Sequence, residues 1–162
     1  MNLIEAMIHK DGERLTATVG VDTLTIHEEA LASHPDIRNY DGRKVIMGIR
    51  PESLEDAAIA TDTPADRRIH GKVVLTEALG SEILAHIGIE GHAATTPETQ
   101  ELKADTGEDR EVTVVEQDAT IMVCRFNPRS RAKDGDNVEV AVDTRSLHFF
   151  DESTGLGIYN GQ

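Results

Sequence analysis

The stretch Gly71–Gly91, with the sequence GKVVLTEALGSEILAHIGIEG, predicts two strands joined by a tight corner. In its second half, apolar residues occupy every second position, at Ile83, Ala85, Ile87 and Ile89. Such a repeat places them on one face of a sheet. The corner, residues 78–82, contains Gly80, which can adopt backbone angles that other residues avoid. We therefore expect a hairpin with one buried face, against which the rest of the chain packs.

The composition limits both the core and the partners. The chain has 162 residues, enough for one domain or two small ones with a real core. Aromatic residues make up 3% of it, so the core has to be built from Val, Ile, Leu and Ala. The 16 basic and 30 acidic residues give a formal charge of −14, which repels phosphate backbones and argues against a nucleic-acid partner. An OB-type nucleic-acid binder would also need stacking aromatics, which are scarce here.

The single cysteine and the hydropathy pattern favour a cytoplasmic location. Cys124 has no second thiol with which to form an internal disulfide, and it falls in a strand-like run, so we expect a small core residue. The sequence contains neither a signal-peptide pattern nor an apolar run long enough to span a bilayer.

Turn signals separate short strand-like runs along the rest of the chain. Asp11-Gly12 is a strong hairpin-turn signal, and Pro51 should end the strand before it. Strands are expected over 3–9, 14–26, 44–49, 111–116, 119–126, 137–143 and 144–151, a short helix over 27–34, and an exposed acidic loop over 92–110. Roughly ten short antiparallel strands with little helix predict an all-β fold, a sandwich or a double OB-like barrel.

Two further segments contain candidate contact residues. Arg129 and Arg131, in the basic cluster at 125–133, could grip a phosphate or a carboxylate patch on a partner; the alternative is a charged turn balanced by neighbouring acids. His148, Phe149 and Phe150 lie in a strand-like run, where adjacent side chains point to opposite faces. One phenylalanine should therefore face the core, and the other should face outward or into an interface, where aromatic residues are favoured.

Motifs of common enzyme classes are absent from the sequence. It has no G-x-x-x-x-G-K-[ST] phosphate loop, no G-x-S-x-G elbow and no H-E-x-x-H pair. His86 and His92 have no neighbours at zinc-ligand spacing, so we interpret them as surface histidines and expect no metal site. The chain is expected to have no catalytic residues and no cofactor of its own.

Four stretches, in the same order, resemble a known family. They are Met1–Ala6 (MNLIEA), Gly48–Leu54 (GIRPESL), Glu77–Glu82 (EALGSE) followed by His86, and Leu147–Asp151 (LHFFD) followed by Thr154-Gly155. Together they resemble the C-terminal domain of the ATP-binding subunits of carbohydrate ABC importers, of the maltose and glycerol-phosphate type. The resemblance covers the whole chain except residues 92–110, where the loop is longer and more acidic than the family pattern.

The resemblance implies a fold and a role. The fold is a TOBE or molybdate-domain-like pair of intertwined OB-like subdomains, roughly residues 1–66 with the C-terminal strand and residues 67–150. The implied role is a non-catalytic regulatory and dimerisation domain, with ATP and Mg²⁺ bound by an ATPase domain that this sequence lacks. The implied partners are a second copy, its own ATPase domain, permease subunits indirectly, and a regulatory protein, at the inner face of the membrane.

The resemblance also suggests roles for the hairpin corner and for three arginines. Ser81 and Glu82, at the hairpin corner, become candidates for a structural or interface contact. Molybdate-type domains of related shape bind oxyanions, so the alternative function is a small-ligand module in which Arg50, Arg129 or Arg131 holds the anion.

Overall fold

The computed structural model describes residues 1–94 and 119–159, and their strands form two antiparallel sheets. The first sheet contains β1 (Asn2–Asp11), β2 (Arg14–Val19), β3 (Asp22–Thr25), β4 (Lys44–Ile49) and β10 (His148–Asp151), in the order β10-β4-β1-β2-β3. The second sheet contains β5 (Leu54–Asp56), β6 (Arg68–Ala78), β7 (Ile83–Glu90), β8 (Ala119–Phe126) and β9 (Asn137–Val142), in the order β5-β9-β6-β7-β8. The helical segments are α1 (Glu28–Ser33), η1 (Pro35–Tyr40), η2 (Pro51–Ser53) and η3 (Ala65–Arg67).

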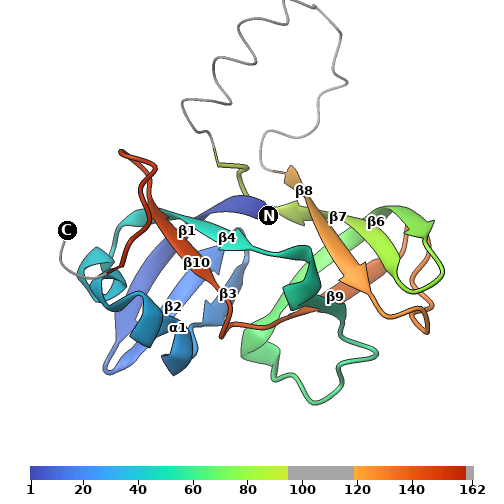
Figure 1. Cartoon of the computed structure of the whole chain (residues 1–162), viewed down its shortest axis with the longest axis horizontal. Helices are drawn as coiled ribbons and strands as arrows, with labels where there is room; N and C mark the ends of the chain where they lie inside the picture. Colours follow the sequence, from blue (N-terminus) through green and yellow to red (C-terminus); the bar gives the residue numbers. More distant parts are fainter. Residues whose placement is uncertain (95–118, 160–162) are drawn as a thin grey trace, which may run out of the picture.

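The two sheets lie side by side along the long axis of the molecule, with the second sheet inserted in the chain between β4 and β10 (Figure 1). The predicted all-β, double OB-like fold with little helix is therefore confirmed. The subdomain boundary near residue 66 stays a prediction. The predicted strand over 111–116, and the acidic loop from residue 95 onward, lie outside the described residues.

The β6–β7 hairpin has the predicted corner and the predicted buried face. Gly80 has φ +87°, and the Leu79 N–H donates to the Glu82 carbonyl over 2.9 Å, which closes the turn. The predicted inward positions of β7 at 85, 87 and 89 are buried. The sequence analysis missed a bulge between Val73 and Leu75, which leaves two apolar side chains of β6, at 74 and 75, largely exposed.

The strand predicted over 14–26 is in fact two strands, and Gly20 is the reason. Its φ of +56° reverses the chain between β2 and β3. A side chain at this position would also collide with the backbone carbonyl of Glu90, at the end of β7. Gly20 therefore makes a turn where the sequence predicts one continuous strand, and it lets the two sheets approach closely.

A single aliphatic core runs through both sheets. Phe126 and Phe149 are among its largest fully buried side chains, and most of the others are Ile, Leu, Val, Met and Ala. Cys124 is fully buried, as predicted, and burial raises the pKa of its thiol far above the usual range. This core places the outer faces of the sheets, and the junction between them, at the surface.

The side-chain amide of Asn2 joins the start of β1, the middle strand of the first sheet, to β8, the edge strand of the second sheet. Its Oδ1 accepts from the Val123 N–H over 2.8 Å, and its Nδ2 donates to the Val123 carbonyl over 2.9 Å. The same Nδ2 also donates to the Ile49 carbonyl over 3.1 Å. Asn2 on β1 therefore pairs with β8 as a peptide group would, and it extends hydrogen bonding across the junction.

We expect Asn2→Ala to destabilise the chain by about 1–3 kcal/mol, because it removes the side-chain partner of the part-buried N–H and carbonyl groups of Val123. Urea titration gives the free energy of unfolding. The matched control is Asn137→Ala, which removes an exposed amide on β9 and should change stability by less than about 0.5 kcal/mol. Equal effects of the two substitutions would contradict the role given to Asn2.

Candidate interaction surfaces and polar hollows

An ion pair ties the corner of the β6–β7 hairpin to β8. Glu82, just before β7, accepts a hydrogen bond from Arg125 Nε on β8. Across the hairpin, His86 Nε2 lies 3.3 Å from a carboxylate oxygen of Glu77. Ser81 is exposed at the tip of the corner. The family motif Glu77–Glu82 followed by His86 thus has a structural explanation. A partner contact at Ser81 or Glu82 stays a prediction.

The two phenylalanines of β10 lie on opposite sides of the first sheet. Phe149 is fully buried in the core, whereas Phe150 is half-buried on the outer face, paired with Ile46 of β4. A Cβ on Gly48 would lie 3.2 Å from the Phe150 ring and 2.8 Å from the Met1 sulfur. We call Met1, Gly48 and Phe150 the outer-face patch. Phe149 fills the core and therefore cannot be an interface residue. Phe150 is the phenylalanine of β10 that a partner could contact.

His148 begins β10 and is only partly exposed. Its pKa is lowered, mainly because burial disfavours the charged ring and secondarily because the Arg50 cation lies nearby. His148 is therefore predominantly neutral at neutral pH, and its ring packs edge-on to His34 with centroids 6.0 Å apart. An interface role for His148 stays a prediction.

The segment after β10 is a turn that one carboxylate closes. Asp151 Oδ1 accepts from the N–H groups of Ser153 and Thr154 over 2.9 and 3.0 Å, and its Oδ2 accepts from the Tyr40 hydroxyl over 2.8 Å. The Tyr40 hydrogen bond is the main reason that the pKa of Asp151 is lowered. The Asp-x-x-Thr-Gly pattern at the end of the chain is therefore explained by turn geometry.

Arg129 and Arg131 border a hollow of about 520 Å³ on the second sheet, which we call the arginine hollow. Three arginines and three carboxylates line it: Arg68, Arg129, Arg131, Asp56, Asp136 and Glu139. The Ser130 hydroxyl donates to the buried Asp56 carboxylate over 2.6 Å, which holds the loop in place. The oxyanion alternative named Arg50 together with Arg129 and Arg131. Arg50 does not line this hollow, so the structure does not bring these three side chains together.

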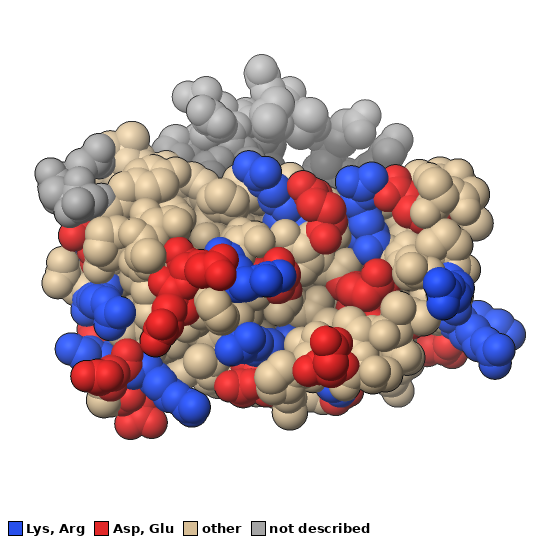
Figure 2. Space-filling view, turned by 60° about the horizontal axis from the view of Figure 1, so that its bottom comes forward, with Lys and Arg blue, Asp and Glu red and all other residues tan. Residues whose placement is uncertain are grey.

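Charges of both signs are interspersed over the face shown in Figure 2, and blue and red side chains alternate over short distances. The largest basic projection lies at one end of this face, beside red side chains. Such mixing produces no continuous basic stripe of the kind that tracks a nucleic-acid backbone.

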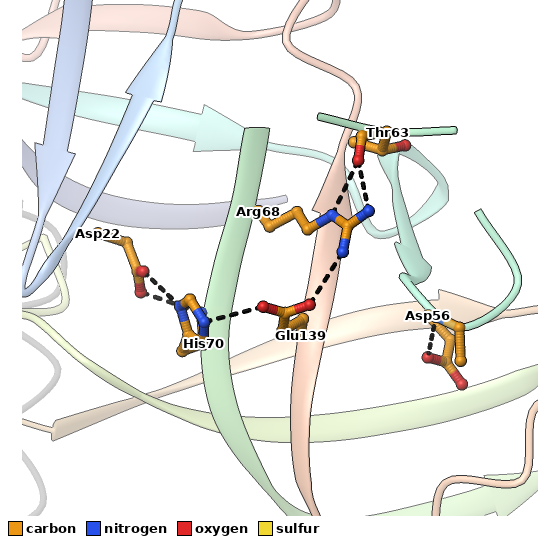
Figure 3. A network of polar contacts seen from close by, with 7 residues as sticks. Asp22, Asp56, Thr63, Arg68, His70 and Glu139 are labelled. Carbon is orange, nitrogen blue, oxygen red and sulfur yellow. Dashed lines mark hydrogen bonds and ion pairs between the residues drawn. The ribbon is translucent and has the colours of Figure 1, made fainter. Parts of the chain in front are cut away.

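A chain of polar contacts joins β3 of the first sheet to β6 and β9 of the second (Figure 3). Asp22 accepts from the His70 backbone N–H over 2.9 Å and contacts His70 Nδ1 over 2.7 Å. His70 Nε2 lies 3.0 Å from Glu139, and Arg68 donates to Glu139 over 2.9 Å. Arg68 also donates twice to the Thr63 carbonyl. The sequence analysis missed this network because its members are far apart in the sequence.

The network shifts two proton equilibria in opposite directions. The hydrogen bond to Asp22 is the main reason that the pKa of His70 is raised, with the Glu139 charge adding to it. The hydrogen bond from Arg68 is the main reason that the pKa of Glu139 is lowered. The folded chain therefore favours a protonated His70 between two carboxylates.

Within residues 1–94 and 119–159, no group of three or more His, Cys, Asp or Glu side chains is arranged to hold a metal ion. His86 is partly exposed and paired with Glu77, and His92 is exposed. In the same part of the chain, none of the helices has the length and apolar character needed to cross a bilayer.

Comparison with known proteins finds two family matches, which overlap at residues 47–54. The MalK OB fold domain matches residues 1–54, and the TOBE domain matches residues 47–122. The trehalose/maltose import ATP-binding protein MalK of Thermococcus litoralis is 29% identical over 160 residues, which cover 98% of this chain and 34% of that protein. The trehalose import ATP-binding protein SugC of Mycobacterium tuberculosis is 30% identical over 164 residues, covering 98% and 38%. The oligosaccharides import ATP-binding protein MsmX of Bacillus subtilis is 28% identical over 140 residues, covering 86% and 30%.

These matches and the two sheets define the class: the chain is an OB-fold and TOBE region of the kind carried by ATP-binding subunits of ABC importers. More narrowly, it belongs with the C-terminal part of the MalK, SugC and MsmX type of sugar-import subunit, and it is not their ATPase domain. The chain spans about a third of the length of the curated relatives it matches. The resemblance inferred from the four sequence stretches is thereby confirmed.

The raised pKa of His70 predicts a pH-dependent contribution to stability. The contribution is complete below the unfolded-state pKa of about 6.5 and is lost as the pH rises through the higher folded-state value. The stability difference between the natural chain and His70→Gln should therefore be largest below about pH 6.5 and should shrink as the pH rises through the folded-state value. The change should be well under about 1 kcal/mol, because the ring is 61% exposed.

Urea titrations at several pH values measure this difference, and an NMR titration of the imidazole gives the pKa directly. His9→Gln is the matched control, because His9 is exposed and its ring has no hydrogen bond or ion pair with the other residues described by the structure. A stability difference for His70→Gln that stays constant, or grows, with rising pH would refute the assigned role.

Proposed function

We propose that this chain is the non-catalytic regulatory and dimerisation region of the ATP-binding subunit of a sugar ABC importer. The similarity over nearly the whole chain to MalK, SugC and MsmX proteins supports this proposal. In it, ATP and Mg²⁺ bind to the ATPase domain of the same subunit, whose phosphate-loop motif this sequence lacks. The subunit lies at the cytoplasmic face of the membrane, held there by permease subunits, and its regulatory region also receives a regulatory protein.

The outer-face patch is the observation that supports a contact between two copies. Met1 is 57% exposed and Phe150 is half-buried on the outer face of the first sheet, although neither is needed to fill the core. A patch that pairs with its own copy across a two-fold axis gives a closed dimer. Such a contact keeps two ATPase domains at a high effective concentration while they open and close.

The small-ligand or oxyanion-binding module is a weaker candidate. Arg129 and Arg131 line one hollow, but three carboxylates line it too, and Arg50 lies elsewhere, beside His148. An oxyanion in the arginine hollow would meet as many negative charges as positive ones, so its affinity would be low. Equilibrium dialysis with molybdate and with phosphate tests this alternative, and stoichiometric binding of either anion would favour it over the regulatory role.

We expect the 162-residue chain to form a weak dimer, and we expect Phe150→Ser to weaken it at least about tenfold, because an aromatic anchor at the centre of an interface contributes about 1–2 kcal/mol or more. Sedimentation velocity over a concentration series measures the dissociation constant. The matched control is Val21→Ser, which removes an apolar side chain that is 72% exposed at the β2–β3 turn and should leave the dimer unchanged.

Two results would contradict this contact. One is a chain that stays monomeric at the highest concentrations. The other is a dimer that Phe150→Ser does not weaken, which would place the interface elsewhere. Because Phe150 lies outside the core, the variant is expected to keep the fold, and circular dichroism checks this.

We also expect this chain to hydrolyse no ATP, because its sequence contains no G-x-x-x-x-G-K-[ST] loop to hold the phosphates. A coupled assay for released phosphate, run on protein purified by two independent routes, is the measurement. Turnover that co-purifies with the chain by both routes would overturn the non-catalytic assignment.

A further inference from the structure

A second hollow lies at the junction of the two sheets, where the chain crosses from one to the other. Its volume is about 430 Å³, within the range of small-molecule sites. Its walls come from both crossings, Glu52–Glu55 after β4 and Asp143–Arg145 after β9, from the 60–67 loop, and from His27 at the start of α1. We call it the junction hollow. The Asp143 N–H donates to the Ser53 carbonyl over 2.9 Å, so its two crossings are fixed to each other.

Two buried polar atoms in the walls of this hollow have no partner. They are the hydroxyl oxygen of Thr144 and the Nε of Arg67, and they are the only such side-chain atoms among the described residues. Thr144 is 1% exposed. Buried polar groups are nearly always hydrogen-bonded, because leaving one unpaired costs free energy. Two exceptions in the walls of one hollow indicate a place where a bound molecule supplies the missing partners.

The charges of the lining restrict the class of that molecule. Four carboxylates and two arginines line the hollow: Glu52, Glu55, Asp62, Asp143, Arg67 and Arg145. Arg145 and Asp143 satisfy each other through contacts of 2.8 and 3.1 Å. The excess of carboxylates disfavours an oxyanion. The unpaired Nε of Arg67 is a hydrogen-bond donor, and an ammonium-type cation, which only donates, cannot be its partner.

The hydrogen-bonding groups that remain are of both kinds. Arg67 donates, the Thr144 hydroxyl donates or accepts, and the carboxylates of Glu52 and Asp62 accept. His27 Nδ1 accepts from the Glu29 N–H over 3.2 Å, which leaves its other ring nitrogen as a donor. A neutral molecule with several hydroxyl groups matches such a lining, because each hydroxyl both donates and accepts.

We propose that the junction hollow is a binding site for a small, neutral, polyhydroxylated molecule of sugar size, in which Thr144 and Arg67 hydrogen-bond the ligand. The two chain crossings form the walls, so a bound molecule contacts the connections between both sheets. The proposal does not depend on the regulatory role or on dimerisation, and each can fail without the other.

The test is a titration of the 162-residue chain with D-glucose and with trehalose, followed by isothermal calorimetry and by amide chemical shifts. We expect saturable binding of at least one of the two sugars, with shifts at Thr144 and Arg67. Inorganic phosphate and putrescine are the anionic and cationic comparisons, and neither should saturate the site.

Thr144→Val is the informative variant, because valine has nearly the same shape as threonine and lacks only the hydroxyl. We expect it to weaken sugar binding about 3- to 10-fold, the loss of one hydrogen bond. Its melting temperature should be unchanged or higher, since the hydroxyl has no partner in the free chain. Arg67→Met should weaken binding as well. The matched control, Thr18→Val, removes a hydroxyl that is paired with Thr23 on the first sheet and should leave binding unchanged.

Three results would overturn the proposal. The first is the absence of saturable binding by either sugar. The second is sugar binding that Thr144→Val does not weaken. The third is saturation of the junction hollow by phosphate or putrescine in place of a sugar.

Discussion

Where the two sheets meet over one core, the edge strand β8 needs hydrogen-bond partners for its outward peptide groups, and Asn2 supplies them at Val123. Its amide pairs with Val123 as a neighbouring strand would, so β1 and β8 are joined although they belong to different sheets. Further along β1, Glu5 and Leu3 bond the backbone of residues 92–94. Peptide groups that would otherwise be left unpaired in a part-buried seam are thus satisfied.

The scarcity of aromatic residues determines how the core is filled and what remains outside it. Of the three phenylalanines in the sequence, Phe126 fills the second sheet's share of the core and Phe149 the first sheet's. Phe150 alone lies outside the core, over Gly48. A phenylalanine at the surface leaves apolar area in contact with water, which is unfavourable. A partner that covers Phe150 would remove this area from water.

Features set by neighbouring residues could be predicted from the sequence, whereas contacts between residues far apart in the chain could not. The β6–β7 hairpin and its buried face follow from a two-residue repeat and one glycine, and both are present. The sequence predicts one strand over 14–26, but Gly20 turns the chain there, at a point where Glu90 of the other sheet approaches too closely for a side chain. Asp22 and His70 are 48 residues apart, and Asn2 is 121 residues from Val123. No spacing in the sequence indicates such contacts. Two of the four family stretches, 48–54 and 77–82, lie at a crossing and at a turn, where geometry restricts the choice of residue, whereas the other two lie mainly in β1 and β10.

The position of β4 between β1 and β10 has a mechanical consequence. Both neighbours run antiparallel to β4, so the start of β1 and the end of β10 lie at opposite ends of the central strand. A force that separates these two points shears the strands along their length, and the six register pairs of β1–β4 and the four of β10–β4 bear it together. The second sheet is threaded into the chain between β4 and β10, so it lies outside the loaded path. Such a load would therefore act mainly on the β1–β4 and β10–β4 pairs of the first sheet, and it would reach the second sheet through side contacts such as that of Asn2 with Val123.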